Sequence, residues 1–181
     1  MSTSRLHTPS KTDKNVLAFA ERLSPGRRPF FVDVRPEDGF EPVQCFQNVA
    51  EKVRRSGGMI VHGWEISLEP KIHLEAQFHA VWQSPGGKFV DVTPQLIPQD
   101  PILFLIDDRH TYTGTLVPDE RFSLGDAKLV SRYLVLVDER MTILQQMGLA
   151  GFGRGHPLYA QRLLPIQSEI ESIRERLQNA T

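Results

Sequence analysis

The chain has 181 residues, and its 21 Lys and Arg nearly balance its 22 Asp and Glu, for a formal net charge of -1. This length suits one globular domain, and the interspersed charges argue against a broad basic surface, so we expect no nucleic-acid partner. The single cysteine excludes an intrachain disulfide and a Cys-rich zinc site, and it favours a reducing, cytoplasmic location. No stretch is long and apolar enough to span a bilayer, so no membrane association is expected.

The first half of the chain alternates helices and strands. Residues 1–11 are polar and are predicted to form a flexible tail, and residues 12–181 a single globular domain. Apolar residues then recur at helical spacing from Val16 to Leu23, behind Asp13 as a start signal. The segments expected to follow are a strand at Phe30–Val34, a helix at Val43–Arg55, a strand at Met59–Leu68, a hairpin within Glu75–Pro94 and a strand at Ile102–Ile106.

The secondary-structure signals are weaker in the second half of the chain. Residues 107–126 are rich in turn formers and are predicted to be a loop bordering the site. The elements expected after it are a strand at Leu129–Val137, a helix at Glu139–Met147 and a glycine-rich linker at Gly148–Pro157. A C-terminal helix within residues 158–181 carries an Ile and Leu stripe, which either covers the protein's own core or docks a partner or a second copy of the chain.

The only cysteine lies where a helix is expected to begin. Cys45 falls in the first turn of the predicted helix, ahead of an apolar stripe and a basic last turn. The positive end of the helix dipole and the free backbone N–H groups at such a position favour a thiolate and stabilise an oxyanion. Cys45 is therefore a candidate nucleophile.

The predicted hairpin carries two further polar residues in a suggestive order. Ala76, Phe78, Ala80 and Trp82 share one face of its first strand, so His79 is expected on the other face. An odd-length loop that sets Ala80 opposite Val90 also sets His79 opposite Asp91. A two-residue Pro85-Gly86 turn would send the two polar side chains to different faces, but its type II geometry splays hairpin strands. We therefore favour the odd loop.

These features together resemble the transglutaminase-like branch of the papain-like superfamily, which includes the arylamine N-acetyltransferases. That family has a cysteine before an aromatic at a helix start, a glycine-terminated helix, a histidine on a later strand and then an aspartate. The matching positions lie within residues 44–94 and are Gln44-Cys45-Phe46, Gly57-Gly58, Val61–Trp64, His79–Trp82 and Val90–Pro94.

The resemblance implies roles for six residues. Cys45 would be the nucleophile, His79 its base and later its acid, and Asp91 the group that orients the imidazole. The Cys45 backbone N–H would form half of the oxyanion hole. Relatives often supply the second donor from a Trp or Gln several residues before the cysteine, and no such residue matches here, so the candidates for oxyanion or substrate binding are Gln44, Gln47 and Trp82.

Three alternatives stay open. Asp33 is a reserve for the acidic member of the site. A metal site is a second reading, drawn from His62, His73, Glu75 and His79, although His73 and His79 would lie about 20 Å apart on an extended strand. A third reading is a non-catalytic interaction module on a papain-like scaffold. No cofactor or metal is expected.

The sequence thus predicts an α+β fold in which a helix presents Cys45 against an antiparallel sheet, with a papain-like or transglutaminase-like core. The predicted function is acyl transfer from an amide or thioester carbonyl through an acyl-enzyme. Protein, peptide and small acyl substrates all fit, and whether water or an amine accepts the acyl group is left open.

Overall fold

The computed structural model describes residues 6–96, 98–115, 117–146 and 159–180. It is a mixed α+β structure, and the chain, expected as one domain, divides into two compact units. The first unit holds residues up to Glu69 together with Leu74–Phe122, and the second holds Pro70–His73 and the residues from Ser123 onward. All the candidate site residues except His73 belong to the first unit.

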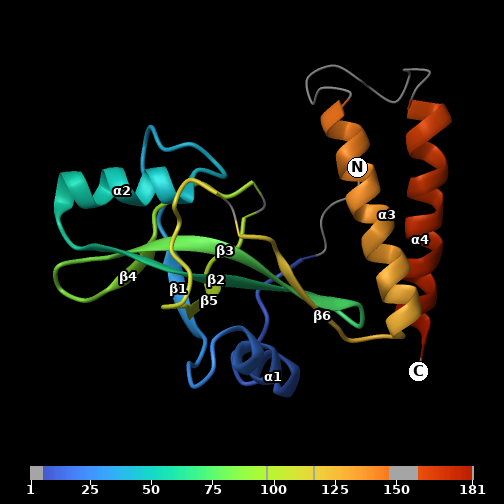
Figure 1. The fold of residues 1–181 in the computed structure, drawn as a ribbon, viewed down its shortest axis with the longest axis horizontal. Helices are drawn as coiled ribbons and strands as arrows, with labels where there is room; N and C mark the ends of the chain where they lie inside the picture. Colours follow the sequence, from blue (N-terminus) through green and yellow to red (C-terminus); the bar gives the residue numbers. More distant parts are fainter. Residues whose placement is uncertain (1–5, 97, 116, 147–158, 181) are drawn as a thin grey trace. The chain divides into compact units, whose positions relative to one another are not determined.

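The first unit is built on a sheet that closes on itself. Its strands are β1 (Phe30–Val34), β2 (Met59–Glu69), β3 (His73–Gln83), β4 (Phe89–Asp91), β5 (Ile102–Ile106) and β6 (Glu120–Ser123). The sheet order is β2-β5-β1-β4-β3-β6, and an additional pairing of β2 with β3 closes the first five strands into a ring (Figure 1). Apolar side chains from all five of these strands fill its interior, among them Val32, Val61, Val81, Phe89 and Phe104.

The sequence analysis expected an antiparallel sheet, but one pair of strands is parallel. β1 and β4 run parallel, with Val34 opposite Asp91. The pairs of β1 with β5, β2 with β5 and β3 with β4 are antiparallel. Because β4 follows β3 through a tight hairpin while β1 comes from much earlier in the chain, the parallel pair depends on a long-range contact that local patterning does not reveal.

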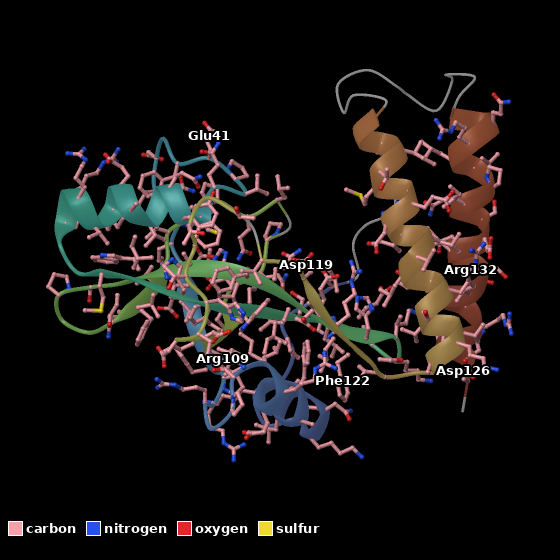
Figure 2. All side chains as sticks on the ribbon, in the orientation of Figure 1. Glu41, Arg109, Asp119, Phe122, Asp126 and Arg132 are labelled. Carbon is pink, nitrogen blue, oxygen red and sulfur yellow. The ribbon has the colours of Figure 1, made fainter. Side chains whose placement is uncertain are left out.

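Two helices of the first unit match the sequence prediction closely. α1 (Lys14–Leu23) begins after Asp13, whose side chain accepts hydrogen bonds from the backbone N–H groups of Asn15 and Val16. Its buried face includes Phe19, whose ring lies 5.7 Å from that of Phe122, a residue labelled in Figure 2. α2 (Cys45–Ser56) lies along the sheet (Figure 1) and ends at a glycine with positive φ, Gly57.

Two segments predicted as irregular make strand contacts. Part of the N-terminal tail is anchored, because His7 pairs with Leu68 of β2 and the Thr8 hydroxyl donates to the Pro101 carbonyl oxygen at 2.7 Å. Residues 1–5 lie outside the described residues. Within the predicted loop at 107–126, residues 120–123 form β6.

The second unit is a helical hairpin, in which the strand predicted at Leu129–Val137 is instead helical. A single helix, α3 (Ala127–Gln146), replaces the strand predicted at Leu129–Val137 and the helix predicted at Glu139–Met147. The run of β-branched and aromatic residues favours a strand locally, but Val130, Tyr133 and Leu136 recur every third residue and are all buried. Packing against a second helix therefore decides the conformation.

That second helix is α4 (Leu164–Asn179), which follows a π-helical turn at Tyr159–Leu163. Its stripe of Ile170, Ile173 and Leu177 is buried against α3, so it covers this unit's own core rather than standing free for a partner. Arg132 of α3, labelled in Figure 2, binds Glu169 of α4 through two hydrogen bonds of 2.7 and 2.9 Å. The predicted linker at Gly148–Pro157 lies outside the described residues. None of the helices in the described ranges has the length and apolarity needed to cross a membrane.

Candidate functional site

The β3–β4 hairpin brings His79 and Asp91 together. The observed register pairs Trp82 with Val90 and Gln83 with Phe89, which is two residues from the predicted register. A shift of two keeps the side-chain parity, and the loop has the predicted odd length, closed by the bond from the Ser84 N–H to the Lys88 carbonyl oxygen at 2.8 Å. His79 Nε2 consequently lies 3.1 Å from Asp91 Oδ2.

The face that carries these two side chains differs from the prediction. His79 alternates with Val81, and Asp91 with Phe89, and both of these apolar residues belong to the cluster inside the closed sheet. The polar pair therefore lies in the interior rather than on a solvated face: the Asp91 side chain is 0% exposed and that of His79 12%. Buried polar groups are normally hydrogen-bonded, so the neighbours of His79 and Asp91 determine the properties of the pair.

Asp91 is held by several donors. The Thr93 backbone N–H donates to Asp91 Oδ1 at 2.9 Å, and the Gln95 amide donates to Oδ2 at 3.4 Å. Burial alone lowers the pKa of His79, but the charge and hydrogen bond of Asp91, a hydrogen bond with the Cys45 side chain and the charge of Glu65 together raise that pKa well above 6.5. The raised pKa favours the charged imidazolium form of His79.

Cys45 is the first residue of α2, and its side chain interacts with His79. The helix begins two residues later than predicted, because Val43 adopts a φ of 59°, a conformation that is strained for a β-branched residue. The side chain of Gln44 makes no capping hydrogen bond, and the first intrahelical bond runs from the Asn48 N–H to the Gln44 carbonyl oxygen. The Cys45 backbone N–H therefore lacks an intrahelical acceptor and stays available to an oxyanion.

A buried asparagine, which the sequence analysis did not single out, fixes the helix to the strand that carries Asp91. Asn48 is 5% exposed. Its side-chain amide donates to the Glu41 carbonyl oxygen at 2.8 Å and to the Thr93 hydroxyl at 3.4 Å. Asn48 thus links the loop before Cys45 to the turn after Asp91. The sequence could have pointed to Asn48, because residues three apart in a helix lie on the same face and Asn48 is three residues after Cys45.

The sequence analysis also missed a second carboxyl group. Glu65 of β2 has the same inward parity as Val61, and its Oε2 lies 3.9 Å from His79 Nδ1. Burial raises the pKa of Glu65, and the charge of Asp91 adds to the rise, while His79 opposes it. The His79 ring therefore has two carboxyl groups beside it, and the ligand atoms of the three residues lie within 4.8 Å of one another. In the sequence, only the alternation of side chains along β2 indicates that Glu65 points inward.

Of the residues predicted for oxyanion or substrate binding, Trp82 lies away from Cys45, whereas Gln44 and Gln47 flank Cys45 near the start of α2. Gln44 and Gln47 are exposed. The Trp82 indole N–H donates to the Gly57 carbonyl oxygen at 2.9 Å, at the far end of α2 from Cys45. A helix of 12 residues is about 18 Å long at about 1.5 Å per residue, so this indole is too distant to stabilise an oxyanion formed at Cys45.

The predicted metal set does not converge either. His62 stacks on Phe78, with ring centroids 5.9 Å apart, and burial lowers the pKa of His62. Glu75 pairs with Arg121 at 2.9 Å, and His73 belongs to the second unit. The reserve acid Asp33 lies on the opposite parity from Val34 and bonds Lys88 at 3.0 Å. The described cluster that does suit an ion is Glu65, His79 and Asp91, whose ligand atoms lie within 4.8 Å of one another.

Comparison with protein-family models, with curated proteins and with solved structures finds no match for this chain. The resemblance of residues 44–94 to transglutaminase-like enzymes therefore stays a prediction that rests on the residues themselves. The function has to be argued from the chemistry of Cys45, His79, Asp91 and Glu65.

Proposed function

We propose that the protein is a cysteine-nucleophile acyl-transfer enzyme, in which Cys45 attacks an amide or thioester carbonyl and His79 moves the protons. The observation that carries this proposal is the environment of His79. Asp91 engages Nε2, which leaves Nδ1 as the ring nitrogen for Cys45, and the raised pKa of His79 favours transfer of the thiol proton to the ring.

In the first half-reaction, the Cys45 thiolate forms a bond to the carbonyl carbon, and the carbonyl π electrons move to oxygen. The Cys45 backbone N–H, free at the start of α2, donates to that oxyanion. When the tetrahedral intermediate collapses, the bond to the leaving group breaks and the His79 imidazolium gives its proton to the departing amine or thiolate. The product is an acyl-enzyme with a neutral His79.

In the second half-reaction, the neutral imidazole removes a proton from water or an amine as that acceptor attacks the acyl carbon. Collapse of the second tetrahedral intermediate breaks the bond to Cys45 and restores the thiolate and imidazolium. Asp91 keeps the ring in one orientation throughout, since it has donors on both oxygens and cannot turn away.

The test is the rate of Cys45 alkylation by iodoacetamide from about pH 4 to about pH 10, in the wild type and in His79→Ala. A thiolate paired with an imidazolium reacts well below the reference thiol pKa of about 8.5. We expect the wild type to react in acid and neutral solution and His79→Ala to lose that reactivity. An inert Cys45, or identical pH profiles, would overturn the proposal.

A second candidate function is binding of a divalent metal by Glu65, His79 and Asp91, because their ligand atoms lie close together. Its weakness is that Asp91 already bonds Nε2 at 3.1 Å, so a metal at that nitrogen would have to replace this hydrogen bond, while Glu65 lies nearest the other nitrogen, Nδ1, at 3.9 Å. Zinc titration followed by calorimetry separates the two readings: stoichiometric binding that persists in Cys45→Ala favours the metal.

A further inference from the structure

The described part of the N-terminal segment is fixed to the sheet that carries the site. The His7 backbone N–H donates to the Leu68 carbonyl oxygen at 3.1 Å, and the Leu68 N–H donates to the His7 carbonyl oxygen at 2.9 Å. The next residue, Thr8, is half-buried, and Pro9 is buried. Because two backbone hydrogen bonds and a buried proline hold this segment, the Thr8 hydroxyl has a defined position on the first unit.

The Thr8 hydroxyl contacts a segment far along the chain. Its oxygen lies 2.7 Å from the Pro101 carbonyl oxygen and 3.0 Å from Gln99 Oε1, and its one proton is shared between these two acceptors. The Gln99 amide donates to the hydroxyl of Ser67, a residue of β2, at 3.5 Å. The side chain of Gln99 is therefore held from two sides, by the N-terminal segment and by β2.

Gln99 in turn binds the residue that contacts Asp91. The Gln99 backbone N–H donates to Gln95 Oε1 at 2.8 Å, and Gln95 Nε2 donates to Asp91 Oδ2 at 3.4 Å. Both ends of the Gln95 amide are thus occupied, which favours one conformation of this side chain. Asp91 Oδ2 is also the oxygen that lies 3.1 Å from His79 Nε2. A continuous series of hydrogen bonds therefore joins Thr8 to the imidazole.

We propose that Thr8 is a positioning residue for the acyl-transfer reaction, acting on Asp91 through the two glutamines. This inference rests on the proposed acyl-transfer function. Asp91 Oδ1 is fixed locally, by the backbone N–H of Thr93, but Oδ2 accepts from Gln95, whose own position depends on the segment that Thr8 holds. A looser Asp91 lets the His79 ring turn, and proton transfer to and from the thiol slows when the ring is misplaced.

The experiment is a double-mutant cycle on the acetylation of Cys45 by 4-nitrophenyl acetate, which forms a thioester and releases 4-nitrophenolate. Single-turnover rates come from mass spectrometry of the intact chain. Gln95→Met, which keeps the length of the side chain but removes its amide, should slow acetylation about 10-fold, and Thr8→Val, which keeps the volume but removes the hydroxyl, about 5-fold. Because Thr8 acts through Gln95, the double variant should be no slower than Gln95→Met alone. Independent effects would instead multiply to about 50-fold.

Rescue by a conservative variant separates positioning from a purely structural role. Thr8→Ser keeps the hydroxyl, so its acetylation rate should stay within about 2-fold of the wild-type rate. Thr12→Val is the matched control, because the Thr12 hydroxyl is exposed and bonds the Ser10 hydroxyl at 3.1 Å. It should leave the rate unchanged. Thermal unfolding checks that each variant is folded, and Gln95→Leu replaces Gln95→Met in the cycle if the latter does not fold.

The outcomes separate the two proposals. If Thr8→Val is acetylated at the wild-type rate, or if the two losses multiply in the double variant, the Thr8 inference is overturned and the acyl-transfer function stands. If Thr8→Ser loses as much as Thr8→Val, the hydroxyl is not the group that acts, and the inference again fails. A wild type that takes up no acetyl group on Cys45 overturns both proposals.

Discussion

Among its described residues, the first unit contains two close aspartate–histidine pairs, and the pairs differ in their surroundings. His79 Nε2 lies 3.1 Å from Asp91, and His110 Nδ1 lies 2.7 Å from Asp107. Both aspartate side chains are 0% exposed, but the His110 side chain is 42% exposed against 12% for His79. Close contact between the two residue types therefore does not by itself distinguish a reactive site from a structural one.

The difference lies in what else each aspartate and histidine contacts. Asp107 accepts from the Trp64 indole at 2.8 Å, the Arg109 backbone N–H at 2.9 Å and the Arg109 side chain at 3.1 Å, in addition to His110. Burial raises the pKa of Asp107, but the hydrogen bonds from His110, Arg109 and Trp64 outweigh burial and lower it. His110 rests against the Trp64 and Phe78 rings.

The Asp91 pair instead contacts two groups that have chemistry of their own, the Cys45 thiol and the Glu65 carboxyl. Asp107 is thus a carboxylate surrounded by hydrogen-bond donors, as in a structural network. The Asp91 pair instead has a thiol and a second carboxyl group beside its ring, and both are groups that can gain or lose a proton. That distinction is what the following substitutions measure.

The largest effect is expected from removing each histidine in turn. His79→Ala should lower the rate of Cys45 acetylation by 4-nitrophenyl acetate by about 1000-fold or more, because the thiol loses its proton acceptor. His110→Ala, the matched control, should change that rate by less than about 3-fold. Equal losses in the two variants would show that the pairs are not functionally distinct.

A smaller effect is expected from Asp91→Asn. The amide keeps the volume and one acceptor oxygen but removes the charge that raises the His79 pKa. The acetylation rate should fall about 100-fold at neutral pH, with the remaining activity shifted to higher pH. Single-turnover acetylation across pH checks this. An unchanged rate and pH profile would mean that Asp91 has a structural role alone.

The sequence predicted much of the first unit because its signals are local. Asp13 before an apolar stripe located α1, alternation located β2 and β3, and the odd loop located the face shared by His79 and Asp91. A register error of two residues left that face unchanged because side chains alternate with a period of two. The site could thus be predicted without the exact pairing.

What the sequence could not supply depends on contacts between distant segments. Glu65 becomes a site residue only because β2 pairs with both β3 and β5, which turns its inward face toward His79. Trp82 was assigned to the site by its position near His79, whereas the pleat directs its indole toward the end of α2. The strand predicted at Leu129–Val137 failed for the same reason, since burial against α4 overrides local β propensity.

Stability should respond mainly to the structural pair. Asp107→Ala leaves the indole N–H of Trp64, a residue only 2% exposed, without its acceptor, so we expect a loss of about 2 to 4 kcal/mol in the free energy of unfolding. The acetylation rate of the folded protein should stay within about 3-fold. Urea unfolding measures the first quantity, and a loss below about 1 kcal/mol would contradict the proposed network.

The smallest effect is a difference in the pH dependence of stability, which has opposite signs for the two pairs. The pKa of His79 is raised on folding, so its stabilising contribution is complete below about pH 6.5 and is lost as pH rises through the folded-state pKa. The pKa of Asp107 is lowered, so its contribution is present above about pH 4 and is lost in acid. Urea unfolding at a series of pH values, in the wild type, His79→Gln and Asp107→Asn, checks both signs. His79→Gln should remove the alkaline loss and keep the acid loss, and Asp107→Asn should do the reverse; a change on the same side of neutrality in both variants would show that the two pairs carry the same protonation chemistry.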